Sequence, residues 1–206
     1  RCNAFPIRMK IIPAIFLQNG QVVSLYKGNE NDQKKIYPKS AKNYAEIFAK
    51  KGASVLEVID LDGKNRERIH EIREVFEGEI WWGGHIRTLE EIEALFADGA
   101  SRVILGEGAA EIYAQALEKF GADKVIAGIK FRNDPDAPDK CAELSRIGFS
   151  DIIVKDLEAD GTLYHPNFDQ IEKCVLFSKA KVYSSGGVAQ YDHINYLKQA
   201  NASGAI

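Results

Sequence analysis

Short apolar runs alternate with amphipathic stretches along the whole of this chain. Seven runs are rich in β-branched residues and almost continuously apolar, which predicts parallel strands that are covered on both faces. These predicted strands are Ile11–Leu17, Val55–Asp60, Glu79–Trp82, Arg102–Leu105, Val125–Lys130, Asp151–Lys155 and Lys181–Ser185. The stretches between them have helical period, as in the segment that opens with the capping pattern of Thr88 and Glu91 and ends near Gly99.

The alternation of strands and helices predicts repeated βα units around one parallel sheet. The chain has 206 residues, of which 45% are hydrophobic, and no low-complexity linker divides it. A chain of this size buries one full core. We therefore predict an α/β fold, a (βα)8 or TIM barrel, which residues 1–206 form as a single domain.

Three ungapped matches indicate that the first half of the chain is repeated in the second half. The matching pairs are Ile12–Asn19 with Ile126–Asn133, Gly52–Leu61 with Gly148–Leu157, and Gly83–Ile104 with Ser185–Ile206. Internal self-similarity of this kind determines architecture. We expect strands one to four to return as strands five to eight, so that two half-barrel repeats make the barrel.

The same register shows where the sequence stops within the second repeat. Ile206 corresponds to Ile104, so the residues that would match Leu105 and Gly106, and a helix after strand eight, do not occur in this sequence. A barrel without its last strand and helix would expose a sheet edge. We therefore expect a truncated last strand and helix, and we expect the natural chain to continue.

Composition and charge argue against several classes of partner. The formal net charge is -3 and opposite charges are interleaved, so no basic block predicts nucleic-acid binding. No apolar run has the length of a membrane span, and residues 1–9 lack the apolar stretch of a secretory signal. Cys2, Cys141 and Cys174 lack metal-ligand spacing, which favours free thiols. We expect a cytoplasmic monomer with no metal, no nucleic acid and no membrane among its partners.

Glycines follow three of the predicted strands. They are Gly83 and Gly84 after strand three, Gly106 after strand four, and Gly186 and Gly187 after strand seven. Glycine lets the backbone approach an anion closely and begin the next helix with free amide groups. Tight turns are the alternative explanation, but their duplication within a barrel favours phosphate binding. We predict two equivalent phosphate sites and a substrate with a phosphate at each end.

The strand-end motifs are similar to those of the histidine-biosynthesis barrels. The motifs are Ile11–Ile15, Val58–Gly63, Gly83–Arg87, Arg102–Gly106, Asp160–Leu163 with Pro166 and Asn167, and Ser185–Val188. This family contains the phosphoribosylformimino-aminoimidazole carboxamide ribotide isomerase and the cyclase subunit of imidazole glycerol phosphate synthase. The isomerase is the more similar of the two at Asp60–Gly63. The resemblance implies an Amadori rearrangement of a bisphosphorylated aminoaldose to an aminoketose, without a metal or organic cofactor.

That rearrangement needs an acid and a base on opposite sides of the sugar. In the family an aspartate ends strand one and another ends strand five, but here these positions are Phe16 and Lys130. Lys155 replaces the family's hydroxyl group near the end of strand six, and His85 and His165 replace glycines. The functional face therefore departs from the family pattern while the framework is intact.

Three explanations of these departures are open. The protein has lost its acid and base and is a non-catalytic phosphate-ester-binding homologue or scaffold. Alternatively, the barrel is repurposed or engineered, and Lys155 or Lys130 forms a Schiff base with a carbonyl substrate. A lysine that serves as a countercharge to Asp160 or to a phosphate is the commoner case. In the third explanation, Asp60 or Asp160 takes over the acid and base roles.

The leading hypothesis is aldose to ketose isomerisation of a phosphorylated ribotide. The predicted site for it has a catalytic part and a part that binds substrate and phosphate. The candidate catalytic residues are Lys130, Lys155, Asp60 and Asp160. The candidate residues for binding substrate and phosphate are Gly83, Gly84, His85, Arg87, Gly106, Thr162, Ser185, Gly186 and Gly187.

Overall fold

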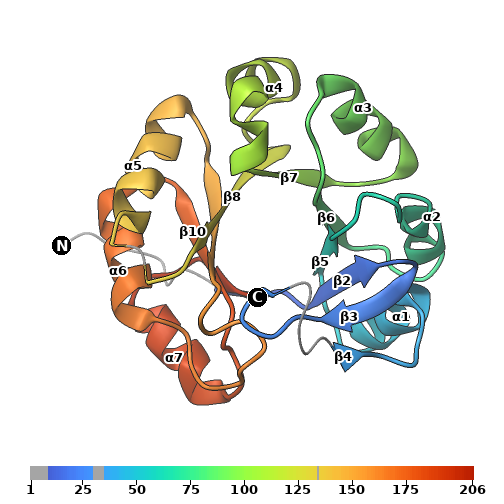
Figure 1. The fold of residues 1–206 in the computed structure, drawn as a ribbon, viewed down its shortest axis with the longest axis horizontal. Helices are drawn as coiled ribbons and strands as arrows, with labels where there is room; N and C mark the ends of the chain where they lie inside the picture. The colour runs from blue at the N-terminus through green and yellow to red at the C-terminus, as the bar shows by residue number, and fades with distance from the viewer. Residues whose placement is uncertain (1–8, 30–34, 134) are drawn as a thin grey trace.

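The computed structural model describes residues 9–29, 35–133 and 135–206, and Cys2 lies outside them. An inner ring of strands is surrounded by helices (Figure 1). The strands are β1 Lys10–Ile11, β2 Ala14–Gln18, β3 Gln21–Ser24, β4 Lys35–Ile36, β5 Val55–Asp60, β6 Glu79–Gly83, β7 Arg102–Gly106, β8 Val125–Phe131, β9 Asp151–Asp156, β10 Lys181–Ser185 and β11 Gly204–Ala205. The helices are α1 Ala41–Lys50, α2 Arg68–Arg73, α3 Leu89–Asp98, the 3-10 helix η1 Glu107–Ile112, α4 Tyr113–Phe120, α5 Ala137–Ile147, α6 Phe168–Phe177 and α7 Tyr191–Gln199.

The predicted α/β barrel is confirmed. The sheet order is β1-β11-β10-β9-β8-β7-β6-β5-β2-β3-β4, and neighbouring strands from β1 through to β2 pair in parallel. All seven predicted strands are present, although the first one is interrupted at Ile12 and Pro13. Parallel strands place their carboxyl ends at the same end of the barrel, which is where barrel sites lie.

The interrupted first strand and the short last strand together close the ring. β1 pairs with β11 and β2 pairs with β5, so the two parts of strand one contact opposite neighbours. The Ile12 amide donates to the Ala205 carbonyl at 2.9 Å, and β11 also pairs with β10. The last strand has two residues, and our expectation that it leaves an exposed edge was wrong, because these residues pair with β1 on one side and with β10 on the other.

A hairpin that we did not predict follows the first strand. β2 and β3 pair antiparallel with Gln18 opposite Gln21, and the loop is Asn19 and Gly20, whose φ angles are 51° and 75°. Positive φ at both positions is the geometry of a type I′ turn, for which Asn-Gly is the preferred sequence. Val22 and Val23 are both buried, so β3 lacks the alternating pattern that would have marked it as a strand.

The two half-barrels repeat each other in backbone detail. The equivalent residues Gly84 and Gly186 have φ angles of 103° and 99°. A methyl group on Gly84 would lie 1.9 Å from the carbonyl oxygen of Asp60, and one on Gly186 would lie 2.7 Å from the carbonyl oxygen of Asp156. Asp60 and Asp156 are equivalent as well, and each accepts hydrogen bonds from the amides two and three residues ahead. The predicted duplication is therefore confirmed.

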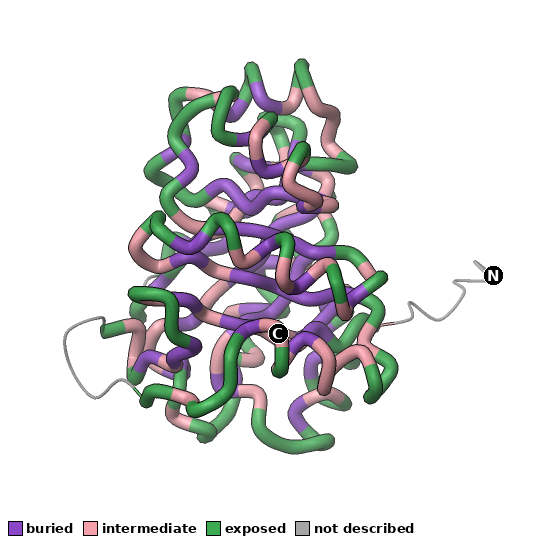
Figure 2. The backbone as a smooth tube through the Cα atoms, turned by 90° about the vertical axis from the view of Figure 1, so that its right-hand side faces the viewer, coloured by how far each residue is buried: buried purple, intermediate pink, exposed green. Residues whose placement is uncertain are grey.

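Apolar side chains form two layers on either side of the strands. The inner layer fills the barrel and comprises Ile12, Val55, Trp81, Ile104, Ile126, Ile153 and Tyr183. The outer layer packs the strands against the helices, so buried positions follow the strands and exposed positions face outwards on the helices (Figure 2). None of the helices in the described part of the chain has the length and apolar character that a membrane crossing requires.

Candidate functional site

A cavity of about 400 Å³ opens at the carboxyl ends of the barrel strands. Its volume is in the range of small-molecule sites. It brings together residues from both half-barrels, as predicted from the repeat. The predicted site residues that line it are Asp60, Gly84, His85, Arg87, Gly106, Lys130, Lys155, Asp160 and Ser185.

The other predicted binding residues lie outside the lining of this cavity. Gly83 is buried in β6, where a methyl group would lie 3.0 Å from Ile104. Gly187 is buried too, with its backbone against the carbonyl group of His165. Thr162 lines a second, more open depression together with His165, and its hydroxyl group donates to the Ala159 carbonyl at 2.8 Å.

Lys155 is held in the cavity by two neighbours. Its ammonium nitrogen lies 3.1 Å from Oδ2 of Asp160 and 4.0 Å from the centroid of the Phe16 ring. Asp160 is only 6% exposed, so its carboxylate is poorly solvated. A carboxylate and the face of an aromatic ring are both attractive partners of a cation. Lys155 therefore has the contacts of a countercharge, which is the commoner role of such a lysine.

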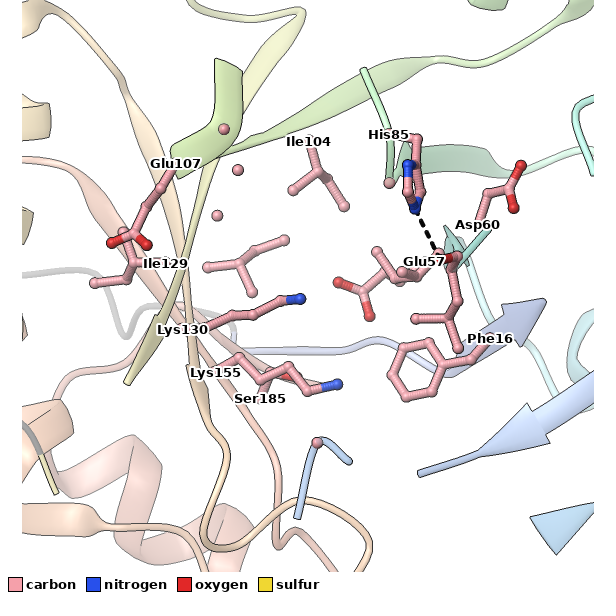
Figure 3. A pocket seen from close by; sticks show the side chains of 18 of the residues that line it. Phe16, Glu57, Asp60, His85, Ile104, Glu107, Ile129, Lys130, Lys155 and Ser185 are labelled. Atoms are coloured by element: carbon pink, nitrogen blue, oxygen red, sulfur yellow. Dashed lines mark hydrogen bonds between the residues drawn. The ribbon is translucent and has the colours of Figure 1, made fainter. Parts of the chain in front are cut away.

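Lys130 is the register partner of Lys155 on the adjacent strand. Its side chain also points into the cavity, so two lysines line the cavity from adjacent strands, and Lys130 stands where the family resemblance led us to expect a carboxylate (Figure 3). Lys130 is exposed, and it has no hydrogen bond or ion pair with any residue that the structure describes. It is available to bind an anionic group of a ligand.

The carboxylate of Asp60 is engaged in its own loop. It accepts hydrogen bonds from the amides of Asp62, Gly63 and Asn65 at 3.3, 2.9 and 2.9 Å, and from the Asn65 side chain at 2.7 Å. Asp60 is 2% exposed and its carboxylate points away from the cavity (Figure 3). This geometry fits a residue that holds the β5–α2 loop rather than the acid or base that the sequence analysis considered.

Glu57 is a cavity residue that the sequence analysis missed. It lies in the middle of β5, is 3% exposed, and directs its carboxyl group into the cavity (Figure 3). Burial raises the pKa of Glu57 to about 7, although the charge of Lys155 opposes the increase. A carboxyl group with such a pKa exchanges protons near neutral pH. The available signal was an acidic residue within an otherwise apolar strand.

The rim of the cavity is formed by the β6–α3 and β7–η1 connections. The ring nitrogen Nε2 of His85 donates to the Leu61 carbonyl at 2.8 Å, which joins the β6–α3 and β5–α2 loops. The Arg87 guanidinium packs on Gly108, where a methyl group would lie 2.6 Å from Nη2. Gly106 begins η1, and the first amides of a helix have no intrahelical partner. This part of the rim combines a cation with backbone donors, as a phosphate group requires.

The chain matches one family and many relatives over nearly its whole length. The family model described as "Histidine biosynthesis protein" matches residues 10–206. The 1-(5-phosphoribosyl)-5-((5-phosphoribosylamino)methylideneamino)imidazole-4-carboxamide isomerase of Streptococcus thermophilus is 34% identical over 96% of this chain and 92% of its own length. The corresponding isomerases of Clostridium novyi and Lachnoclostridium phytofermentans are 34% and 32% identical, each over 96% of this chain and 91% of the relative. This chain therefore belongs to the histidine biosynthesis protein family.

Proposed function

We propose that this protein isomerises an aldose to a ketose in a small substrate that carries phosphate esters. The observation that carries the proposal is a cavity that is lined by residues of both half-barrels and combines a phosphate-type rim with the Lys155–Asp160 ion pair. The relatives are isomerases whose names describe a compound with two 5-phosphoribosyl groups. The same substrate class is our proposal for this chain.

In this proposal the substrate is held at the rim and reacts further inside. Arg87 and the backbone amides around Gly84 and Gly106 bind one phosphate, and Lys130 binds an anionic group on the opposite side. Lys155 donates a proton to the ring oxygen of the aminoaldose, which allows the bond from that oxygen to carbon 1 to break. Asp160 positions the Lys155 ammonium group at 3.1 Å.

Turnover of the relatives' substrate by the purified protein tests this function. Formation of the aminoketose above the level of a mock purification is expected. The Lys155→Met variant should lower kcat by about 100-fold or more, because the proton donor is lost. The control is Lys119→Met, which removes an exposed lysine that pairs with Glu93 on the outer surface. No product from the wild-type protein at high enzyme concentration would reject the proposal.

Phosphate-ester binding without turnover is the second candidate function. It is favoured by Phe16 and Lys130, which stand where the family resemblance places the acid and the base. Calorimetric titration with ribose 5-phosphate, in parallel with the turnover assay, separates the two functions. Tight binding without product would support the second candidate over the isomerase.

A further inference from the structure

The proposed function has not yet used Glu57, a carboxyl group of the cavity that is held neither in a loop, as Asp60 is, nor in an ion pair, as Glu107 is with Lys140. Glu57 is 3% exposed as a whole, and no hydrogen bond or ion pair joins its carboxyl group to any residue that the structure describes. Its oxygens are not among the buried side-chain atoms that lack a partner, so they are open to the cavity and available to a ligand. The carboxyl group points into the space that a ligand would occupy (Figure 3).

The surroundings of Glu57 combine low polarity with a few charges. Strand β2 contributes the Phe16 ring and β7 contributes Ile104, while β6 contributes no titratable group to the cavity lining. The other charged or titratable side chains that face this cavity are Lys130, Lys155, Asp160, His85, Arg87 and Glu107. Burial is the main reason that the pKa of Glu57 rises; the positive charge of Lys155 lowers it and the negative charge of Asp160 raises it.

We propose that Glu57 is the base of this site and carries a proton from carbon 2 to carbon 1 of the bound aminoaldose. This inference rests on the isomerase function proposed above and adds a catalytic residue to it. The geometry that supports it is a carboxyl group without a partner among the described residues, on a residue that is 3% exposed, facing the cavity that the Lys155–Asp160 ion pair also lines. Asp60 does not have this geometry because its oxygens already accept four hydrogen bonds within its own loop.

The proton transfers balance without any further reactant. Lys155 gives a proton to the ring oxygen, the bond from carbon 1 to that oxygen breaks, and the nitrogen lone pair forms a double bond to carbon 1. The Glu57 carboxylate then removes the proton from carbon 2, and the electron pair moves through carbon 1 to the nitrogen as an enolamine. Neutral Lys155 takes the hydroxyl proton of carbon 2 as the ketone forms, and Glu57 returns its proton to carbon 1.

The first experiment compares three variants in the turnover assay. Glu57→Gln should lower kcat by about 100-fold or more while the affinity for substrate changes little, since only the proton transfer is lost. Glu57→Asp should recover part of the activity because a carboxylate is retained. The control Glu93→Gln removes an exposed carboxylate that pairs with Lys119 far from the cavity, and it should behave as the wild type.

The pH profile gives a readout that a purely structural role would not produce. Because the carboxylate is the active form, kcat/KM of the wild type should rise with pH and level off above about 7. This acidic limb should be absent from the residual activity of Glu57→Gln. If Glu57→Gln keeps kcat within threefold of the wild type, or keeps the acidic limb, the inference is wrong while the isomerase function stands.

A titration without turnover keeps the inference testable if the wild-type protein forms no product. Carbon-13 NMR of labelled glutamate side chains should show one carboxyl group that titrates near 7, that is absent from Glu57→Gln, and that shifts when ribose 5-phosphate is added. A response to ribose 5-phosphate supports Glu57 as the ligand-facing base for another phosphorylated sugar. An ordinary carboxyl pKa, or no response to the sugar phosphate, overturns it.

Discussion

The ammonium group of Lys155 lies 4.0 Å from the centroid of the Phe16 ring, so strands from the two half-barrels meet through a cation and an aromatic face. Phe16 lies in the middle of β2, and Lys155 is the last residue but one of β9. The Lys155 side chain is 16% exposed, so little water competes with the ring. The Lys155 ammonium group thus has two neighbours, the electron-rich face of the Phe16 ring and the carboxylate of Asp160.

We predict that Phe16 and Lys155 stabilise the fold together. A double-mutant cycle of Phe16→Leu, Lys155→Met and the double variant should give a coupling energy of about 1 kcal/mol, because leucine retains apolar volume but lacks the ring quadrupole. The measurement is urea unfolding of the four proteins. Additive effects within about 0.3 kcal/mol would show that the ring and the ammonium group do not interact.

Glu57 should make the stability of the protein depend on pH. Its pKa is raised from 4.5 to about 7 in the folded state, so the folded protein holds this proton over a range in which the unfolded chain releases it. The wild type should therefore lose stability as pH rises from about 4.5 to about 7, by about 3 kcal/mol from this buried group. Glu57→Gln should remove this loss, as seen by comparing urea unfolding of both proteins at about pH 4 and about pH 8.

The comparison at acidic pH serves as the internal control for Glu57. Below the unfolded pKa the carboxyl group is protonated in both states, and glutamine is then a close substitute for it. The two proteins should have similar stability there and diverge in favour of Glu57→Gln above about pH 7. A constant difference across this range would mean that Glu57 titrates normally.

The sequence was sufficient to predict the barrel because the strand patterns are local and occur in both halves of the chain. Strands such as Val125–Phe131 are apolar except at Lys130, since both faces are covered, and the repeat supplied the order of the strands. The sequence did not identify Glu57 as a site residue. The pKa of Glu57 depends partly on Lys155, which lies four strands away in the barrel order. One acidic residue in an apolar strand does not reveal which charge it will face.

The sequence was also insufficient to explain the glycines at the rim of the cavity. The glycine at position 84 is already required by the close approach of its backbone to Asp60, whether or not an anion binds there. Sequence patterns cannot separate these two reasons for a glycine. By contrast, the position of Arg87 against Gly108 depends on two different loops, and only the folded chain brings these residues together.

Gly84 should be among the least replaceable residues of the chain. Alanine at this position combines an unfavourable φ of +103° with a methyl group 1.9 Å from the Asp60 carbonyl oxygen. We expect Gly84→Ala to lower the free energy of unfolding by about 3 kcal/mol or more. Gly52→Ala is the matched control, because φ is +84° there but nothing lies within 4 Å of the new methyl group.

The difference between these two glycine variants isolates the close contact. Gly52→Ala should lose only about 1 to 2 kcal/mol, which is the penalty for a side chain in the left-handed region. Gly186→Ala, with a 2.7 Å approach to Asp156, should fall between the two. Equal losses at Gly84 and Gly52 would show that the β6–α3 turn moves freely away from β5.

The opposite end of the barrel contains a buried ion pair whose loss should be costly. Nη2 of Arg102 lies 3.0 Å from Oδ2 of Asp151, whose Oδ1 accepts a hydrogen bond from the Tyr183 hydroxyl at 2.7 Å. Asp151→Asn leaves the Arg102 charge buried without its counter-ion, so it should lower the free energy of unfolding by about 3 to 5 kcal/mol. Adding Arg102→Met should recover part of this loss, because the unpaired cation is then removed.

Urea unfolding of the single and double variants measures this effect, and pH supplies an independent check. Burial alone would raise the pKa of Asp151, but the Arg102 guanidinium and the hydroxyl groups of Ser150 and Tyr183 outweigh it and lower that pKa below 3.8. The stability from the ion pair is therefore present above about pH 4 and is lost as pH falls through the folded pKa. The advantage of the wild type over Asp151→Asn should shrink in acid. If the double variant is instead less stable than Asp151→Asn, the packing of Arg102 on the Trp81 ring, at 5.0 Å, matters more than its unpaired charge.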